Sequence, residues 1–576
     1  MGELNEQTQV LIVGGGPTGL LASILLSKHE IPHVLVEQRS STLNAPAAHV
    51  VNTRTMEIYK QVGLSVDDLY ALNSHPDARY VSWKSRLEQP PIGVFDLASN
   101  REAMRRQAQV SSEHSTNISQ HLLEAHLKAF AEQSSFADIR YGVTWQGFVD
   151  SNLKLSRVES SGGVSEIEYC YMLGADGASS SVARALNIKK VGPDAIATFL
   201  NLTCEVDISQ ASGETDALLY WLLDPDVMGT MIVHDPKQLS VYMRPLSVPF
   251  ESIKDYDDDR CDQLVKSIFG NQPYRIRHKG IWKMTAQVAD KFREGPVFLV
   301  GDSIHRFPPT GGLGLNTGVG DVHNLVWKIA AALDGGLSSQ EADALLDSYE
   351  MERRPVAQRN CDVSKENNEK MTEVLQAVGL DPANADILPK VMNSTFVKAL
   401  PAGLQRLVRT VMIKPLRRIL SNAQAADAKG NAIRKDVAAA IANQKEHFGS
   451  IGLDLGYVYQ DGCAVEDDAV KTQSSAVTAY TECVASGARF PDRTIVGAAG
   501  QFRLHDLFDY KSYSVLKFGS ADAGSLNTFG LPLQVHDLSL LHCPDNSTIA
   551  ESLGLDGVGW VLVRPDGHTS AVGYSQ

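Results

Sequence analysis

The chain has 576 residues, 43% of them hydrophobic, and a formal net charge of -15 at pH 7. A sequence of this length and composition can bury the apolar cores of two to four globular domains. The acidic balance argues against nucleic acid and against an anionic membrane as partners. No run of 18 or more apolar residues occurs in the sequence, so we expect no membrane-spanning helix.

Seven cysteines are scattered along the chain without a C-x-x-C pair, at positions 170, 204, 261, 361, 463, 483 and 543. An odd, dispersed set predicts reduced thiols in a cytoplasmic protein, rather than a disulfide framework or a metal site. The first residues contain no basic stretch followed by a cleavage site, so we expect no secretory signal and a cytoplasmic location.

An apolar strand at residues 10–13 is followed by a glycine-rich turn and an apolar helix, and a second strand ends at Glu37. In the turn, Gly14, Gly16 and Gly19 allow a tight bend, close approach of a pyrophosphate and close helix–strand packing. Glu37 stands about twenty residues further on, where an acidic side chain accepts hydrogen bonds from an adenosine ribose. This order predicts a dinucleotide site, although a βαβ unit without nucleotide would carry the same glycines.

A second strand–loop–helix unit lies at residues 297–328, which read VFLVGDSIHRFPPTGGLGLNTGVGDVHNLVWK. Its strand ends at Asp302, a loop rich in glycine and proline follows, and apolar residues then recur at helical spacing. The start of that helix offers unpaired N–H groups and partial positive charge to an anionic ligand. An ordinary strand–loop–helix connection would use the same glycines for its turns. The interpretation as a ligand-binding unit therefore rests on the length and residue order of the whole segment.

Two further segments complete the pattern. Residues 174–184 read GADGASSSVAR and contain an Asp-Gly turn. Residues 191–285 are dominated by short β-like runs, which predict an antiparallel sheet. The aromatic and polar residues of these runs suit a flat, partly apolar ligand.

The segments at 10–63, 174–184, 297–330 and 345–357 resemble, in order and spacing, the FAD-dependent aromatic hydroxylases. These are single-component flavoprotein monooxygenases. The resemblance covers essentially the whole chain. Within the family, the chain is most similar to the phenol hydroxylase-like subfamily, whose members have a thioredoxin-like C-terminal domain. This resemblance implies an α/β fold with a Rossmann-type FAD-binding domain, an inserted antiparallel β-sheet substrate domain and a thioredoxin-like tail.

The domain boundaries follow from the same resemblance. The discontinuous FAD-binding domain with its helical extension would comprise residues 1–80, 100–190 and 286–450. The substrate-binding sheet would comprise residues 81–99 and 191–285, and the thioredoxin-like domain residues 451–576. Because the tail has no C-x-x-C, which thiol exchange would need, we expect a packing module or the interface of a homodimer.

The cofactors implied are FAD, bound without a covalent link, and NADPH or NADH together with O2. The cofactor-binding positions carried over are Gly14, Gly16, Pro17, Thr18, Gly19, Glu37, Gln38, Gln120, Asp176, Asp302, Pro309, Gly312, Gly314, Leu315 and Asn316. Backbone N–H groups of residues 314–316 would stabilise negative charge on the flavin. Many relatives have arginine at the positions of Ala47 and Ala183, and here Arg184 follows the second, which leaves the route of the nicotinamide cofactor open.

The activity implied is NAD(P)H- and O2-dependent hydroxylation of a phenolic aromatic compound through a flavin C4a-hydroperoxide. The cofactor carries the difficult chemistry, while the protein positions the small aromatic substrate and excludes water. An alternative is a Baeyer–Villiger or epoxidising reaction on a polyketide-like substrate, which the product would distinguish. A flavin-binding protein without oxygenation is a third reading, because a fold alone does not fix a function.

The catalytic candidates from the resemblance are His49, Tyr242 and Pro309. His49 has an unperturbed pKa near 6.5, so we expect it to accept the phenolic proton while Tyr242 holds the oxygen. Pro309 would wall the place where oxygen reacts. The substrate-lining candidates are Tyr220, Trp221, Met231 and His234. Without the resemblance, the histidines would be ordinary satisfied side chains and the others core residues of half-buried strands.

Two local expectations concern the second half of the chain. Residues 345–357 predict a helix that is interrupted near Pro355, where we expect Arg353 and Arg354 to be structural. Residues 421–435, rich in Ala and Asn with one Gly, predict a mobile loop.

Overall fold

The computed structural model describes residues 6–99, 101–213, 216–463, 474–498, 500–519 and 526–574. Its first sheet has the strand order β18-β19-β10-β1-β2-β7, with the hairpin strand β9 paired to β10 and β8 to β9. The central strands β19, β10, β1, β2 and β7 are parallel. The bounds are β1 Glu6–Val13, β2 His33–Glu37, β7 Ala137–Tyr141, β8 Thr144–Phe148, β9 Leu155–Ser160, β10 Gly163–Gly174, β18 Arg293–Glu294 and β19 Val297–Leu299.

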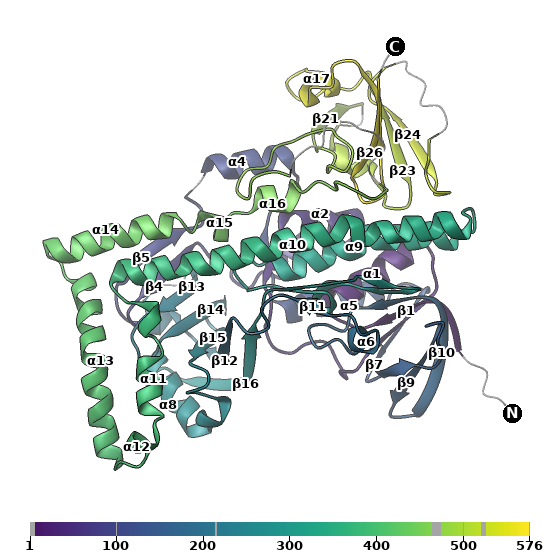
Figure 1. Ribbon diagram of the computed structural model, residues 1–576. Helices are drawn as coiled ribbons and strands as arrows, with labels where there is room; N and C mark the ends of the chain where they lie inside the picture. Colours follow the sequence, from purple (N-terminus) through teal and green to yellow (C-terminus); the bar gives the residue numbers. More distant parts are fainter. Residues whose placement is uncertain are drawn as a thin grey trace.

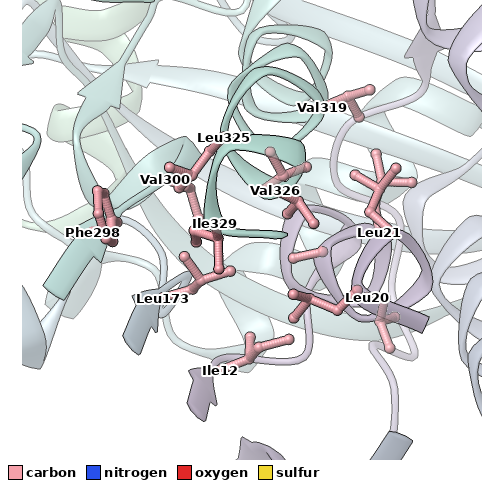
Figure 2. Close-up of a cluster of buried hydrophobic side chains, with 14 of the residues drawn as sticks. Ile12, Leu20, Leu21, Leu173, Phe298, Val300, Val319, Leu325, Val326 and Ile329 are labelled. Carbon is pink, nitrogen blue, oxygen red and sulfur yellow. The ribbon is translucent and has the colours of Figure 1, made fainter. Parts of the chain in front are cut away.

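The core of this region lies between the parallel sheet and two helices, α1 Pro17–Lys28 and α9 Leu313–Leu333 (Figure 2). Parallel strands covered on both faces read as continuous apolar runs, and residues 10–13 are all buried. The two helices touch closely, since a Cβ added to Gly318 of α9 would stand 2.6 Å from the Thr18 hydroxyl of α1. The predicted strand–helix–strand unit and the helix after Asp302 are therefore confirmed.

A second sheet has the order β16-β12-β15-β14-β13-β4-β5. One of its faces packs on α8, Asp258–Phe269, and the other packs partly on the long helices (Figure 1). The sheet is not purely antiparallel as predicted, because β4 pairs in parallel with β13 after the chain has left the sheet and returned. The bounds are β4 Tyr80–Lys84, β5 Pro91–Asp96, β12 Ala197–Val206, β13 Ala217–Leu222, β14 Gly229–Asp235, β15 Leu239–Leu246 and β16 Tyr274–Met284.

Two local predictions about helices are wrong. Helix α10, Ser339–Val378, continues through Pro355. The carbonyl that loses its hydrogen-bond partner belongs to Met351, a half-exposed residue on the solvent side of the helix. Residues 421–435 are mostly helical: α13, Ala402–Gln424, and α14, Ala428–Ala442, leave only three residues between them. The alanines favour helix, and Asp427 caps α14 by accepting a hydrogen bond from Gly430 N at 2.8 Å.

The C-terminal region contains a four-stranded sheet, β24-β23-β25-β26, with its own apolar core. It lies beside α9 and α10 on the side away from the parallel sheet (Figure 1). All seven cysteines are free thiols. Among the described residues no helix is long and apolar enough to cross a membrane. The bounds are β23 Tyr513–Lys517, β24 Leu533–Asp537, β25 Val558–Val563, β26 Thr569–Tyr574 and α17 Ile549–Leu553.

A fully buried group of charges joins this C-terminal sheet to α9 and α10. Glu352 of α10 accepts from Lys328 Nζ of α9 at 2.8 Å and from both terminal nitrogens of Arg564 at 2.9 Å. Arg564 also donates to Asp566 in the turn after β25, from Nε at 3.0 Å. Burial alone would raise the pKa of Glu352, but Arg564 and Lys328 outweigh it and lower the pKa to about 2. Glu352 is therefore ionised, and removal of one of its charged partners would strongly destabilise the folded protein.

We predict that Glu352→Gln destabilises the protein by about 3–5 kcal/mol, because the isosteric amide leaves Lys328 buried without a counter-charge and removes one of the two carboxylates that pair with Arg564. Thermal unfolding followed by circular dichroism measures this as a midpoint several degrees lower. The matched control is Glu366→Gln, an exposed carboxylate on the same helix, which should leave the midpoint unchanged. Equal midpoints for the two variants would contradict the assignment.

Candidate functional site

Three loops meet at the carboxyl ends of the parallel strands, after β1, β10 and β19. They are hydrogen-bonded to one another through their first residues: Ala175 N donates to Val13 O at 2.8 Å, and Val300 N to Gly174 O at 3.1 Å. Gly14 has φ +111°, and a Cβ there would lie 2.3 Å from Ala175 O. The glycine turn and the Asp-Gly turn therefore touch at a place that only glycine allows.

The first loop leads into a helix start that is open toward a ligand. α1 begins at Pro17 with Gly16 as its N-cap residue and no side-chain cap. A Cβ on Gly16 would meet nothing within 4 Å, whereas one on Gly19 would lie 2.0 Å from Gly14 O. Gly19 thus serves packing, while Gly16 leaves free space beside uncapped N–H groups, where a pyrophosphate fits. Thr18 lies between this turn and Gly301, 2.9 Å from where a Cβ of Gly301 would stand.

Glu37 ends β2 at the same edge of the sheet. Its carboxylate accepts from Gly15 N at 2.7 Å and from Arg39 N at 2.9 Å. Burial would raise the pKa of Glu37, but Arg39 and these N–H groups outweigh it and lower the pKa. An ionised acceptor is therefore held beside the glycine turn, with the exposed Gln38 next to it, as a ribose would require.

The loop after β19 brings Asp302 to the start of α9. Asp302 is exposed in a short 3-10 turn, and its Oδ1 lies 3.9 Å from where a Cβ of Gly314 would stand. The N-cap residue of α9, Gly312, has φ +64° and offers no side-chain cap. The first N–H groups of α9, including those of Gly314 and Leu315, are thus available to an electron-rich ligand edge. Pro309 is exposed in the loop just before, and its carbonyl accepts from Gly312 N.

The side chain of Asn316 is fully committed to protein contacts. Its Oδ1 accepts from Asn52 N at 2.9 Å and from Thr55 Oγ1 at 2.8 Å, and its Nδ2 donates to Val50 O and Gly312 O. The side chain of Asn316 therefore has no free polar group to offer a ligand. The side chain instead ties the start of α9 to the segment that follows His49.

Gln120 and Asp176 complete the predicted cofactor positions. Gln120, at the start of α5, Gln120–Ala131, accepts from Ala48 N at 3.1 Å and donates to Glu124 at 2.8 Å. Asp176 Oδ2 caps α6, Ser181–Ala185, by accepting from Ser181 N and Val182 N. Asp176 Oδ1 is buried and has no hydrogen-bond partner among the described residues. Such an orphaned acceptor fits a ligand hydroxyl at this place.

Positive charge gathers beside the Asp176 and Asp302 loops. Lys190 Nζ donates to Asp302 O at 2.8 Å and to Ala178 O at 3.3 Å, and Arg184 donates to Ser179 O at 2.6 Å. Burial, and then the nearby Arg306, lowers the pKa of Lys190 to about 8. In the part of the chain that the structure describes, none of these three cations forms an ion pair. Uncompensated cations at this edge suit the phosphates of a dinucleotide.

His49 and His234 lie together near the start of α9. Their rings are 5.4 Å apart in an edge-to-face arrangement. His49 Nδ1 is 3.1 Å from Asn117 Oδ1, and His234 Nδ1 is 2.7 Å from Ser119 Oγ. Burial lowers the pKa of both histidines, so both are neutral at pH 7. Val50, next to His49, stands 2.6 Å from where a Cβ of Gly312 would lie, which places the pair beside the glycine loop of α9.

Three of the other predicted substrate residues lie elsewhere. Tyr242, Tyr220 and Met231 belong to the buried core between the second sheet and α8. The Tyr242 hydroxyl donates to Val227 O and Met228 O, at 2.9 and 2.8 Å. Trp221, on the opposite face, packs against the apolar cluster formed with α10, α13 and α14. Tyr242 therefore cannot hold a substrate oxygen without breaking its own bonds, and of the four lining candidates only His234 reaches His49.

Sequence reasoning missed Asn117, Ser119 and Asp321. The first two orient the histidines through the pairing of β3, Val50–Val51, with β6, Thr116–Asn117, for which no local pattern exists. Asp321, fully buried in α9, accepts from Gly301 N at 3.1 Å, His305 Nε2 at 2.7 Å and Arg353 Nε at 3.0 Å. The available signal was an acidic residue, Asp321, flanked by glycine and valine in the buried part of the predicted helix.

The geometry agrees with comparison to known proteins. The family model for an FAD binding domain matches residues 7–364. The chain belongs to this FAD-binding-domain family. One curated relative is aklavinone 12-hydroxylase DnrF of Streptomyces peucetius, which is 31% identical over 62% of this chain and 73% of its own length. Another is 2,4-dichlorophenol 6-monooxygenase of Cupriavidus pinatubonensis, which is 27% identical over 66% of this chain and 65% of its own length.

Solved structures extend the likeness to the whole fold. The flavin-dependent monooxygenase PieE, in complex with FAD and substrate, superimposes with a TM-score of 0.82 at 24% identity, over all of this chain and 97% of PieE. The chain spans 57 to 66% of the length of several bacterial relatives that it matches. The FAD-binding family is thus established for residues 7–364, and the PieE likeness establishes the fold.

We predict that Gly16→Ala separates FAD binding from folding in this FAD-binding-domain protein. The added methyl meets no protein atom, so the apoprotein should unfold at the same temperature. It would fill the space beside the α1 N-terminus, so we expect the FAD dissociation constant, measured by fluorescence titration, to rise at least about tenfold. Gly403→Ala, equally free of contacts, is the control. Unchanged FAD affinity in Gly16→Ala would remove this turn from the pyrophosphate site.

Proposed function

We propose that this chain is a FAD-dependent monooxygenase that uses NAD(P)H and O2 to hydroxylate a phenolic aromatic compound. The observation that carries the proposal is the neutral His49–His234 pair, held beside the uncapped start of α9. A base next to the electron-rich edge of the cofactor is what hydroxylation of a phenol needs. In support, relatives carry the names 2,4-dichlorophenol 6-monooxygenase and aklavinone 12-hydroxylase.

The residues around α9 indicate which part of the reaction the protein would carry out and which part the cofactor would supply. Bound FAD, reduced by a hydride from NAD(P)H, supplies the activation of O2. The protein would hold FAD by the glycine turn, Glu37 and Asp302, and would stabilise negative charge with the N–H groups of residues 314–316. The buried Pro308 and its neighbour Pro309 would exclude water from the reacting side.

His49 is suited to take the phenolic proton. Its Nδ1 donates to Asn117 Oδ1, so the proton resides on Nδ1 and Nε2 keeps its lone pair. Burial lowers the pKa of His49, so this nitrogen stays a free base at neutral pH. Phenols have pKa values of roughly 10, and transfer of the proton to a positioned base makes the ring electron-rich enough to react.

The domain roles belong to the same proposal. Residues 1–80, 100–190 and 286–450 would bind FAD, and the sheet of residues 81–99 and 191–285 would cover the substrate. Residues 451–576 would form a thioredoxin-like tail that packs rather than transfers electrons, and the active form would be a cytoplasmic homodimer. One face of the C-terminal sheet has an apolar core of its own, which supports the boundary near residue 451, while Tyr513, Val515 and Leu562 on the other face join the main core.

The proposal is tested by a substrate screen. Purified protein loaded with FAD is supplied with NADPH or NADH and a panel of phenols, and nicotinamide consumption is compared with product mass. We expect at least one phenol to gain a single oxygen as a ring hydroxyl, in proportion to the NAD(P)H consumed. A lactone product would instead indicate Baeyer–Villiger chemistry, and the absence of any oxygenated product from phenols and polyketide-like ketones would refute a monooxygenase.

We predict that His49→Ala keeps FAD and its reduction by NAD(P)H but diverts oxygen to H2O2. A positioned base contributes about 10²–10⁴-fold, so hydroxylation should fall by that order at pH 7. Because burial lowers the pKa of His49, wild-type coupling should be flat from pH 6.5 to 8, whereas variant coupling should rise as pH approaches the phenol pKa of roughly 10. His278→Ala, an exposed histidine, is the control. Identical coupling in both variants at every pH would exclude His49.

We predict that the tail thiols carry no electrons. Cys463 and Cys483 are half-buried, and burial raises the pKa of both, which disfavours the reactive thiolate. The triple change Cys463→Ser, Cys483→Ser and Cys543→Ser should therefore leave turnover per bound flavin within about twofold of wild type. A large loss of turnover in a folded, flavin-loaded triple variant would show that the thiols take part.

A further inference from the structure

A helical arm projects from one end of the molecule and carries a charge opposite to that of the whole. It consists of residues 387–424: α11 Ile387–Met392, α12 Thr395–Lys398 and α13 Ala402–Gln424. Figure 1 shows it along the edge opposite the N-terminus. The arm contains seven Lys or Arg residues and no Asp or Glu, in a chain whose net charge is -15. Its basic residues are Lys390, Lys398, Arg406, Arg409, Lys414, Arg417 and Arg418.

One face of α13 holds the arm in place. Ile413, Leu420 and Ala423 are buried against the body of the protein. Arg409 donates to Asp226 at 2.7 Å and Arg417 to Asp224 at 2.8 Å. The inward cations are thus neutralised, and the opposite face of the helix is fixed toward solvent.

That outward face is apolar in its first half and cationic in its second. Leu404, Leu407 and Val411 are 47, 58 and 63% exposed, and their spacing of three and four residues places them in one stripe. Lys414 and Arg418 continue the same stripe, and neither forms an ion pair within the described ranges. Phe396, 75% exposed in the preceding α12, adds a large ring near the apolar end. Leucine, valine and phenylalanine at such exposure on one helical face indicate a binding surface.

The positive charge of the arm distinguishes between two possible binding partners of the stripe, a second copy of the chain and an anionic lipid surface. A second copy of the chain would bring its own cationic stripe against this one, with Lys and Arg facing Lys and Arg. The four apolar side chains are also too few for a stable protein interface, which buries about 800 Å² per partner. An anionic lipid surface complements both halves of the stripe, because acyl chains receive the apolar side chains and phosphates receive the cations.

We propose that the arm docks this protein reversibly on anionic membranes. α13 would lie along the interface with Leu404, Leu407, Val411 and Phe396 inserted among the headgroups. Lys414 and Arg418 would bind lipid phosphates. The net charge of the chain argues against an anionic membrane as a partner of the surface as a whole, and the basic arm is the local exception. The acidic remainder of the surface is repelled by the membrane, so the protein would approach arm first. This inference does not depend on the proposed activity, since it concerns a face that no residue of the candidate site occupies.

The test is sedimentation of the full-length, FAD-loaded protein with vesicles. One set is phosphatidylcholine alone and the other is two parts phosphatidylcholine to one part phosphatidylserine. We expect binding to the second set that weakens as salt is raised. Lys414→Glu with Arg418→Glu should lower the partition coefficient by at least about tenfold, since each basic residue near such a surface is worth roughly a factor of five. Leu407→Ser with Val411→Ser should lower it as well.

Matched variants carry the same changes on other exposed positions. Lys154→Glu with Lys237→Glu, and Val164→Ser with Val191→Ser, should bind vesicles as wild type does. Equal flavin content and unfolding temperature establish that all variants are folded. Three outcomes would overturn the proposal: no sedimentation with either vesicle, equal loss in arm and control variants, or a dimer in light scattering that the Leu407/Val411 variant converts to monomer. The last would assign the stripe to a second copy.

Discussion

The position of the loop that carries Asp302 depends on one buried carboxylate, Asp321. It receives hydrogen bonds from the backbone at Gly301, from His305 and from Arg353, so it joins the loop, α9 and α10 at a single point. Burial would raise the pKa of Asp321, but His305 and Arg353 outweigh it and lower the pKa. An ionised group with all its partners in place fixes geometry, because any displacement would leave a buried charge unpaired.

The glycine-dependent parts of the fold were predictable from the sequence, because each close approach leaves a residue that nothing else can replace. Gly14 against Ala175 and Gly19 against the carbonyl of Gly14 are such places. The course of α10 through Pro355 was not predictable from local rules. There the neighbours Glu352 and Arg353 are bound to α9 by ion pairs, and these tertiary contacts hold the helix across the missing hydrogen bond.

The positions of the candidate residues on the second sheet were predictable only in part. The central strands β14 and β15 are buried on both faces along much of their length, so alternation in their sequences does not reveal which face packs on α8. Tyr220, Met231 and Tyr242 fell on the α8 face for this reason. His49 and His234 were named from resemblance, but Asn117 and Ser119, which orient them, come from a two-residue pairing remote in sequence. Such pairings are specified by the assembled fold rather than by any local pattern.

The buried charges between the tail and the rest of the chain limit how this architecture can evolve. Arg564 pairs with Asp566 and with Glu352, which also binds Lys328. The backbone carbonyl of Asp566 accepts from Arg54. Arg489 pairs with Glu57 of α2, Thr53–Gln61, the helix that begins a few residues after His49. A tail exchanged by recombination near residue 451 would strand several of these charges in the interior. Residues on the two sides of the boundary near residue 451 must therefore change together in evolution. The tail is part of a shared core and cannot be exchanged between proteins as an independent domain.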